Sequence, residues 1–333
     1  MSSGQKPHSA TAAVVLAAAT FCWATSFPAM RALGLHQTAL VPGVSSLFLA
    51  AVSVLVRFAV AALALAVWRG RDFAGFTRLE IWQGAGLGFF GGIGILLQMD
   101  GVIHIAASTS AFLTQGYCVW VPVVVAWQRR EWPSKTLAIS CAMVLGGVAV
   151  LADLHASDLR LGRGEAETLV ASLLFTGQIL WLERPLFAAG RAVPVTLAMF
   201  AVVALLVLPA ALLTGGGPRE WAAVCRSGPA AALTVFLTVV CTLVPYTLMN
   251  HWQQRMSATQ ASLIYACEPL LASVLVLFVP AWLSRLAAVN YPNEVIGAHL
   301  LLGGGLVIAA NLLVLRQASK KAPATSRPAP GER

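Results

Sequence analysis

The sequence predicts an all-α membrane protein with ten transmembrane helices, arranged as two inverted repeats of five helices each. Three observations lead to this prediction: the composition, the number of long apolar runs, and a similarity between the two halves of the chain. Of the 333 residues, 58% are hydrophobic and only 11% are charged, whereas soluble proteins carry about 25% charged residues. So few charges do not cover a soluble surface of this size. Disorder is excluded because it requires low hydrophobicity.

Ten runs are apolar over the ~20 residues that a helix needs to cross the hydrocarbon core. The first follows the polar segment MSSGQKPHSA and is too long for the apolar region of a signal peptide. The separators carry charges and helix breakers, as in RGRDFAGFTR and GGGPRE. The predicted spans are 12–33, 45–68, 81–103, 107–127, 134–152, 166–186, 193–214, 228–251, 257–283 and 294–315.

The distribution of lysine and arginine predicts the orientation. If the N-terminus is cytoplasmic, the inner segments hold 15 Lys and Arg and the outer segments hold 6, which follows the positive-inside rule. Both termini are therefore expected in the cytoplasm, with the chain in the cell inner membrane. The expected organisation is a cytoplasmic N-terminus at 1–11, a first repeat at 12–152, an external linker at 153–165, a second repeat at 166–315 and a basic cytoplasmic tail at 316–333.

The two halves align at a nearly fixed offset. Ala107-Ser108 matches Ala258-Thr259 at an offset of 151, which places Tyr117 opposite Glu268, and Gly146 falls on Gly305 near the ends. An ordered series of such matches indicates duplication. Because each half contains five spans, an odd number, the second half enters the membrane from the opposite side. Inverted repeats of this kind occur in secondary transporters, whose substrate sites lie near the midplane where the repeats meet.

Five segments resemble the EamA type of the drug/metabolite transporter superfamily: FCWATSFPAMRAL (21–33), VRF (56–58), LLQMDGVIHIAASTSAFLTQGYCVWVPVVVAW (96–127), SATQASLIYACEPLLASVL (257–275) and VIGAHLLLGGGLVI (295–308). The resemblance covers most of both repeats. It implies a ten-helix fold that works by alternating access around a central cavity, and members that move amino acids, other small metabolites, nucleotide sugars or drugs. The sequence departs from the family before the last helix, where VPAWLSRLAAVNYPNE lacks the usual Gly-Glu pair.

Polar side chains at membrane depth are costly, so they mark candidate functional positions. Glu268 lies about 16 Å into the predicted ninth helix, near the midplane. It is equally suited to bind a substrate amine or carry a proton, and to serve as a structural carboxyl beside the kink at Pro269. The predicted substrate-binding residues are Trp23, Ser26, Gln98, Thr114, Tyr117, Gln178, Asn250, Tyr265 and Glu268.

Several of these positions have a structural alternative. The alternative role for Trp23 and Tyr117 is packing in the core of the bundle. For Gln98 and Asn250 it is hydrogen bonding between helices. Arg57, in the second predicted span, is expected to be structural, either paired with a carboxylate or extended toward the interface. The glycines at 84, 88, 91, 92 and 94, and those at 303–305, are expected to allow close helix packing.

Other functional classes lack the residues they need. The six histidines have no metal-like spacing, the six cysteines form no C-x-x-C pair, and neither H-E-x-x-H nor a serine elbow occurs. We therefore expect no metal, no cofactor and no catalytic residue. Because the basic residues are dispersed, no nucleic-acid partner is expected either. The expected partners are a small-molecule substrate and membrane lipid, with the chain a monomer or homodimer.

The predicted function is a secondary transporter that exports small metabolites such as amino acids. The alternatives within transport are drug-like, nucleotide-sugar or lipid-linked solutes. A membrane-embedded enzyme and a receptor or scaffold are the alternatives from other classes.

Overall fold

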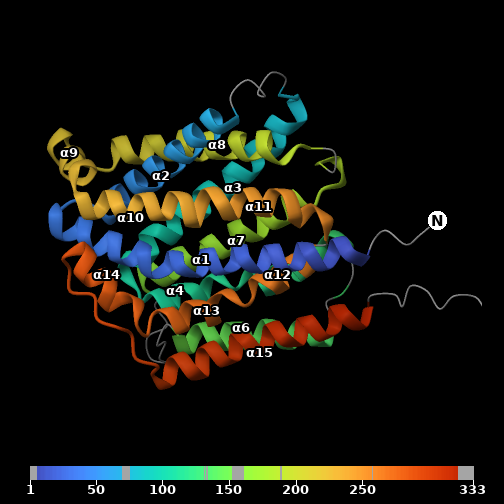
Figure 1. Ribbon diagram of the computed structural model, residues 1–333. Coiled ribbons are helices and arrows are strands. Elements are labelled where there is room, and N and C mark those ends of the chain that lie inside the picture. The colour runs from blue at the N-terminus through green and yellow to red at the C-terminus, as the bar shows by residue number, and fades with distance from the viewer. Residues whose placement is uncertain are drawn as a thin grey trace, which may run out of the picture.

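The computed structural model describes residues 6–69, 76–130, 132, 134–151, 161–187, 190–256 and 258–321. Over these residues all regular structure is helical, and the helices form one bundle (Figure 1). The beginning of α1 and the end of α15 lie at the same end of that bundle (Figure 1). Its helices are α1 (Lys6–Leu40), α2 (Ser46–Arg69), α3 (Arg78–His104), α4 (Ala107–Thr114), α5 (Tyr117–Gln128), α6 (Lys135–Leu151), α7 (Arg163–Leu182), α8 (Ala192–Leu213), α9 (Pro218–Arg226), α10 (Gly228–Thr238), α11 (Val244–Trp252), α12 (Ala258–Tyr265), α13 (Glu268–Leu275), α14 (Val279–Ala287) and α15 (Ala298–Lys321).

Every predicted span contains helix, and the protein is a multi-pass membrane protein. By length and composition, six of the described helical segments are able to cross a membrane, or seven if the bent pair α13–α14 counts as one. Helix α6 and the apolar part of α15 are shorter than a full span. The count of ten crossings therefore stays a prediction.

Helix α1 corrects the first predicted boundaries. It begins at Lys6 and ends at Leu40, so it is longer than 12–33 and includes part of the expected N-terminal segment. At the other end of the chain, α15 continues to Lys321, into the expected tail. Most of the predicted linker at 153–165, and the tail beyond 321, lie outside the described residues.

The predicted ninth span, 257–283, is wrong as a single helix. It consists of α12, α13 and α14, and the axes of α13 and α14 are bent by 64°. Proline explains the bend: Pro280 has no N–H to donate to the carbonyl of Val276 four residues earlier. The backbone N–H of Glu294 donates to the Val276 carbonyl instead, at 2.9 Å. The chain after α14 thereby returns to the break.

Glycines bring α3 close to α8. A Cβ at Gly84 would lie 2.7 Å from the carbonyl oxygen of Val195, and one at Gly88 would lie 2.8 Å from that of Met199. Helix α3 also packs along α7, and α6 packs along α15. Gly303 faces α6, whereas a Cβ at Gly305 would meet nothing within 4 Å. Close packing is thus confirmed for Gly84, Gly88 and Gly303, and Gly305 does not contribute to it.

Two interrupted helices, α4–α5 and α12–α13, pack against each other. Helix α4 ends at Thr114 and α12 ends at Tyr265, while α5 begins at Tyr117 and α13 begins at Glu268. All of these boundaries differ by 151 residues, the offset seen in the sequence. Helix α4 packs against α13 and α5 against α12, so the two breaks lie together.

Candidate functional site

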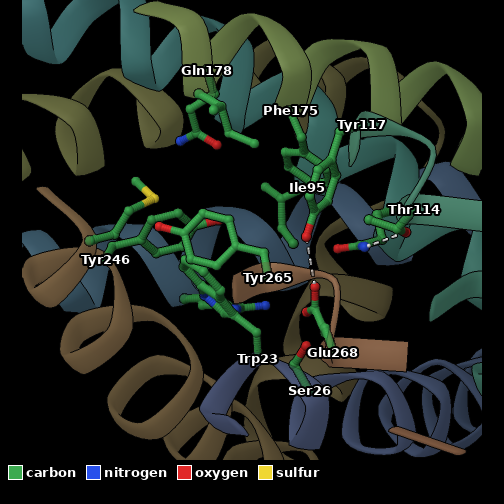
Figure 2. A pocket seen from close by; sticks show the side chains of 14 residues that line it. Trp23, Ser26, Ile95, Thr114, Tyr117, Phe175, Gln178, Tyr246, Tyr265 and Glu268 are labelled. Carbon is green, nitrogen blue, oxygen red and sulfur yellow. Dashed lines mark hydrogen bonds between the residues drawn. The ribbon is translucent and has the colours of Figure 1, made fainter. Parts of the chain in front are cut away.

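A pocket lies at the two helix breaks, with an empty volume of about 530 Å³ including space open to solvent. Its lining comes from nine helices, and the side chains point inward from several sides (Figure 2). The lining residues are Trp23, Ser26, Arg57, Ile95, Gln98, Thr114, Tyr117, Phe175, Gln178, Ile179, Tyr246, Met249, Tyr265 and Glu268.

Glu268 supplies the acidic group of the pocket. It is buried at the first turn of α13, and its carboxylate points toward the phenol of Tyr117 (Figure 2). Its Oε2 accepts from the Tyr117 hydroxyl at 3.3 Å and from Nε2 of Gln115 at 3.0 Å. No donor within the described residues reaches Oε1. The carboxylate is thus fixed through one oxygen, while the other is available to a ligand.

Aromatic rings form one wall of the pocket. Trp23 makes edge contacts with Tyr246 and Tyr265, each with 5.4 Å between ring centroids. The hydroxyl of Tyr265 donates to Oε1 of Gln253 at 2.9 Å, which holds the ring from outside the pocket. The indole Nε1 of Trp23 is buried and has no acceptor among the described residues. The wall therefore offers an apolar surface together with an unused donor.

Amides and hydroxyls complete the lining. Nε2 of Gln98 donates to Oγ1 of Thr114 at 2.9 Å (Figure 2), and Nε2 of Gln178 donates to the carbonyl of Leu87 at 3.5 Å. Ser26 lies beside Glu268 (Figure 2). Each amide is thus anchored through its nitrogen.

Arg57 is a buried cation in the same lining, with 3% of its surface exposed. Its Nη2 donates to the carbonyl of Cys241 at 2.9 Å, its Nε donates to Oγ1 of Thr242, and its Nη1 contacts Sδ of Met30 at 3.8 Å. Among the described residues it forms no ion pair. Neither of the expected roles, a carboxylate partner or extension to the interface, applies to it.

Eight of the nine residues selected from the sequence lie around this one pocket; Asn250 does not. The Asn250 amide is buried and donates to Oγ1 of Thr196 at 2.9 Å, so it faces α8. Helical periodicity gives the face of a side chain but not the neighbour that covers it, which is why the sequence did not separate Asn250 from the rest.

The sequence analysis missed several lining residues. Tyr246 carried a usable signal, because it is a polar aromatic residue next to Pro245 within an apolar run. Ile95, Phe175, Ile179 and Met249 carried none, since apolar residues inside a membrane helix look alike. Gln115, which holds Glu268, had the same signal as its neighbour Thr114. Within the described residues, no group of three His, Cys, Asp or Glu side chains is arranged to hold a metal ion.

Comparison with known proteins bears on the fold of the whole chain and on the family of its first half. Twenty-five chains of solved structures match this one. One of them, titled "Crystal structure of protein", has a TM-score of 0.58 at 16% identity, over 93% of this chain and 98% of its own. At that identity the similarity concerns the fold. No curated protein matches. Residues 10–152 match the EamA-like transporter family.

The apolar helices thus belong to a multi-pass membrane protein, and residues 10–152 match a family of transporters. The family match confirms the resemblance over residues 10–152: this part of the chain is similar to the EamA type of the drug/metabolite transporter superfamily.

Proposed function

We propose that the protein is a secondary transporter that exports small metabolites across the inner membrane by alternating access. In this proposal residues 12–152 and 166–315 are two inverted five-helix repeats, and both termini are cytoplasmic. The two repeats rock about the pocket, which opens to one side of the membrane at a time. The substrate is a small molecule, and lipid surrounds the bundle.

The contact between Tyr117 and Glu268 carries the proposal. The two residues start equivalent helices after equivalent breaks, and their side chains meet in the pocket. Interrupted helices at membrane depth are tolerated where they line a cavity, and transporters bind substrate at such breaks. An ionisable group held there is a functional candidate by default.

Amino acids are the substrates that the lining supports best. A carboxylate accepts from an amine, and aromatic rings cover an apolar side chain. Drug-like, nucleotide-sugar and lipid-linked solutes are the alternatives. A nucleotide sugar has less support, because its phosphates require several cationic partners and the described lining contains one, Arg57.

Counterflow in liposomes tests the proposal. Purified wild-type protein is reconstituted with unlabelled amino acids inside, and entry of the same labelled amino acids is measured. We expect exchange of a small set of amino acids, and loss of at least tenfold in initial rate for Glu268→Gln. Glu220→Gln is the matched control, since Glu220 lies in α9 and does not line the pocket; we expect it to exchange like wild type.

Two results would count against the proposal in different ways. Full exchange by Glu268→Gln would show that the carboxylate does not take part in transport and that Glu268 has a structural role. Absence of exchange for every amino acid by folded wild-type protein removes the substrate class, and drug-like and lipid-linked solutes are then screened by the same assay.

A further inference from the structure

Arg57 is a permanent positive charge with no negative partner in the described protein. A guanidinium does not lose its proton in proteins, and Arg57 is buried at the level of the pocket. A buried charge without a counter-charge is costly in a membrane protein. A structural role alone does not require a charge here, because the contacts of Arg57 are all made to neutral groups.

The local sequence explains how this side chain is held. Pro245 has no N–H, so the carbonyl of Cys241, four residues earlier, loses its helical donor. The backbone widens to a π-helix over Val239–Leu243 at this point, a distortion often found at functional sites. Nη2 of Arg57 donates to the Cys241 carbonyl at 2.9 Å, and Nε donates to Oγ1 of Thr242.

These contacts orient the guanidinium without neutralising it. The hydroxyl of Thr242 donates a hydrogen bond to the carbonyl of Leu237 at 2.9 Å. Both oxygen acceptors of Arg57, the Thr242 hydroxyl and the Cys241 carbonyl, are therefore neutral and held in place. For the third nitrogen, Nη1, the described residues provide a single partner, the thioether of Met30 at 3.8 Å, which is a weak acceptor. The arrangement holds a cation in place beside the pocket and leaves donor capacity unused.

The pocket therefore contains two opposite charges that are kept apart. Glu268 lines it from α13 and Arg57 from α2, and the two do not form an ion pair. Each has unused capacity of its own kind: Oε1 on the acid and Nη1 on the base. The indole N–H of Trp23, which is buried and has no acceptor among the residues that the structure describes, is a second donor in this lining. Such a lining matches a molecule that carries both a cation and an anion.

We propose that Arg57 binds the carboxylate of the transported solute, and that the pocket selects zwitterions with an aromatic or large apolar side chain. This inference rests on the proposed transport function and specifies its substrate. The substrate amine contacts Glu268, the carboxylate contacts Arg57 and Trp23, and the side chain packs against the rings of Tyr246 and Tyr265. A molecule that lacks either charge leaves a buried partner unpaired, and is rejected for that reason.

Three related probes test the selection directly. L-phenylalanine carries both charges, phenethylamine lacks the carboxylate, and 3-phenylpropionate lacks the amine. Each is measured as a competitor of labelled L-phenylalanine counterflow by wild-type protein. We expect each singly charged analogue to compete at least tenfold more weakly than L-phenylalanine. If phenethylamine competes as well as L-phenylalanine in wild type, the role of Arg57 is overturned.

Variants of Arg57 separate carboxylate binding from packing. Because Arg57→Gln removes the cation, we expect its preference for L-phenylalanine over phenethylamine to disappear, while Arg57→Lys retains most of it. Arg31→Gln is the matched control: Arg31 also donates to backbone carbonyls, at 2.8 Å to Val102, but does not line the pocket. Its preference is expected to equal that of wild type. An unchanged preference in folded Arg57→Gln overturns the inference.

The wild-type measurement keeps the inference testable if Arg57→Gln does not fold. It also distinguishes the two proposals. Transport of phenethylamine or 3-phenylpropionate in preference to L-phenylalanine leaves a transporter without zwitterion selection, so only the inference fails. Failure of folded wild type to bind or move any probe or amino acid contradicts the substrate class of the proposed function as well.

Discussion

The hydroxyl of Tyr117 lies 3.3 Å from the carboxylate of Glu268, and the two residues are separated by the 151 positions that relate α4–α5 to α12–α13. Equivalent positions in the two halves thus contact each other in the pocket. One position carries a phenol and the other a carboxylate, so the contact pairs a donor with an acceptor. If the two halves arose by duplication, as the sequence predicts, they kept a shared geometry here, and the different residue types at the two positions provide the donor and the acceptor.

Tyr117→Phe tests the donor in this contact. The substitution keeps the ring and removes the hydroxyl, so that within the described part of the chain Gln115 alone still donates to Glu268. A hydrogen bond to a charged group contributes about 1.5–3 kcal/mol, and we expect counterflow to fall by roughly tenfold. Tyr291→Phe is the control, because the buried Tyr291 hydroxyl has no partner in the described structure. Equal rates for Tyr117→Phe and wild type would show that this bond does not support transport.

Gly88→Ala tests the close approach of α3 and α8. The new Cβ would meet the backbone carbonyl of Met199 at 2.8 Å, and backbone does not shift as cheaply as a side chain. Overpacking of this kind costs about 1–3 kcal/mol, so we expect a lower melting temperature in detergent. Gly305→Ala adds the same methyl group where nothing lies within 4 Å, and should melt like wild type. A similar loss in both variants would attribute the effect to the loss of glycine itself.

Glu80 is expected to matter more than its ionic partner Arg191. Its carboxylate accepts from the Arg191 side chain at 2.7 and 3.0 Å, and also from the backbone N–H groups of Thr77 and Arg191. Glu80→Ala loses all of these bonds, and we expect a destabilisation of about 1.5–3 kcal/mol.

Arg191→Ala retains the two backbone contacts of Glu80. The Arg191 side chain is 53% exposed, and exposed ion pairs contribute little to stability. Thermal melting of the two variants and of the double variant measures the difference. Equal losses in the single variants would show that the ion pair, rather than the helix cap, provides the stability.

The charge distribution predicts that both termini lie in the cytoplasm. Fluorescent protein fused to the C-terminus folds in the cytoplasm and not after export, whereas alkaline phosphatase behaves in the opposite way. We expect fluorescence from a fusion after Arg333 and phosphatase activity from one after Gly217, before α9. The reverse pattern would invert the direction of every helix in the proposed arrangement.

Much of the fold followed from the sequence, because membrane helices must be long and apolar. The breaks did not follow. Residues 115–116 and 266–267 interrupt helices inside apolar runs, and hydropathy does not register a change of backbone direction. The signal at α14 was Pro280, and its effect depended on a distant donor, the N–H of Glu294.

The candidate site could be predicted from the sequence because polar side chains at membrane depth are energetically costly and therefore stand out in apolar runs. A glutamate, glutamines and tyrosines in apolar runs are conspicuous, and eight of the nine selected residues lie around the pocket. Arg57 was equally conspicuous, yet its surroundings were not predictable. Its acceptors include a backbone carbonyl, which every residue has, so no side chain in the sequence identified the partner.

The anchoring of Arg57 has a consequence for how substitutions in related chains should correlate. Pro245 frees the carbonyl that Arg57 uses, so the arginine depends on a proline that contributes no bond to it. Among homologues, loss of the proline is expected to accompany loss of the arginine. A search for co-varying positions would then report position 57 together with position 245. The two positions are linked through the backbone carbonyl of Cys241.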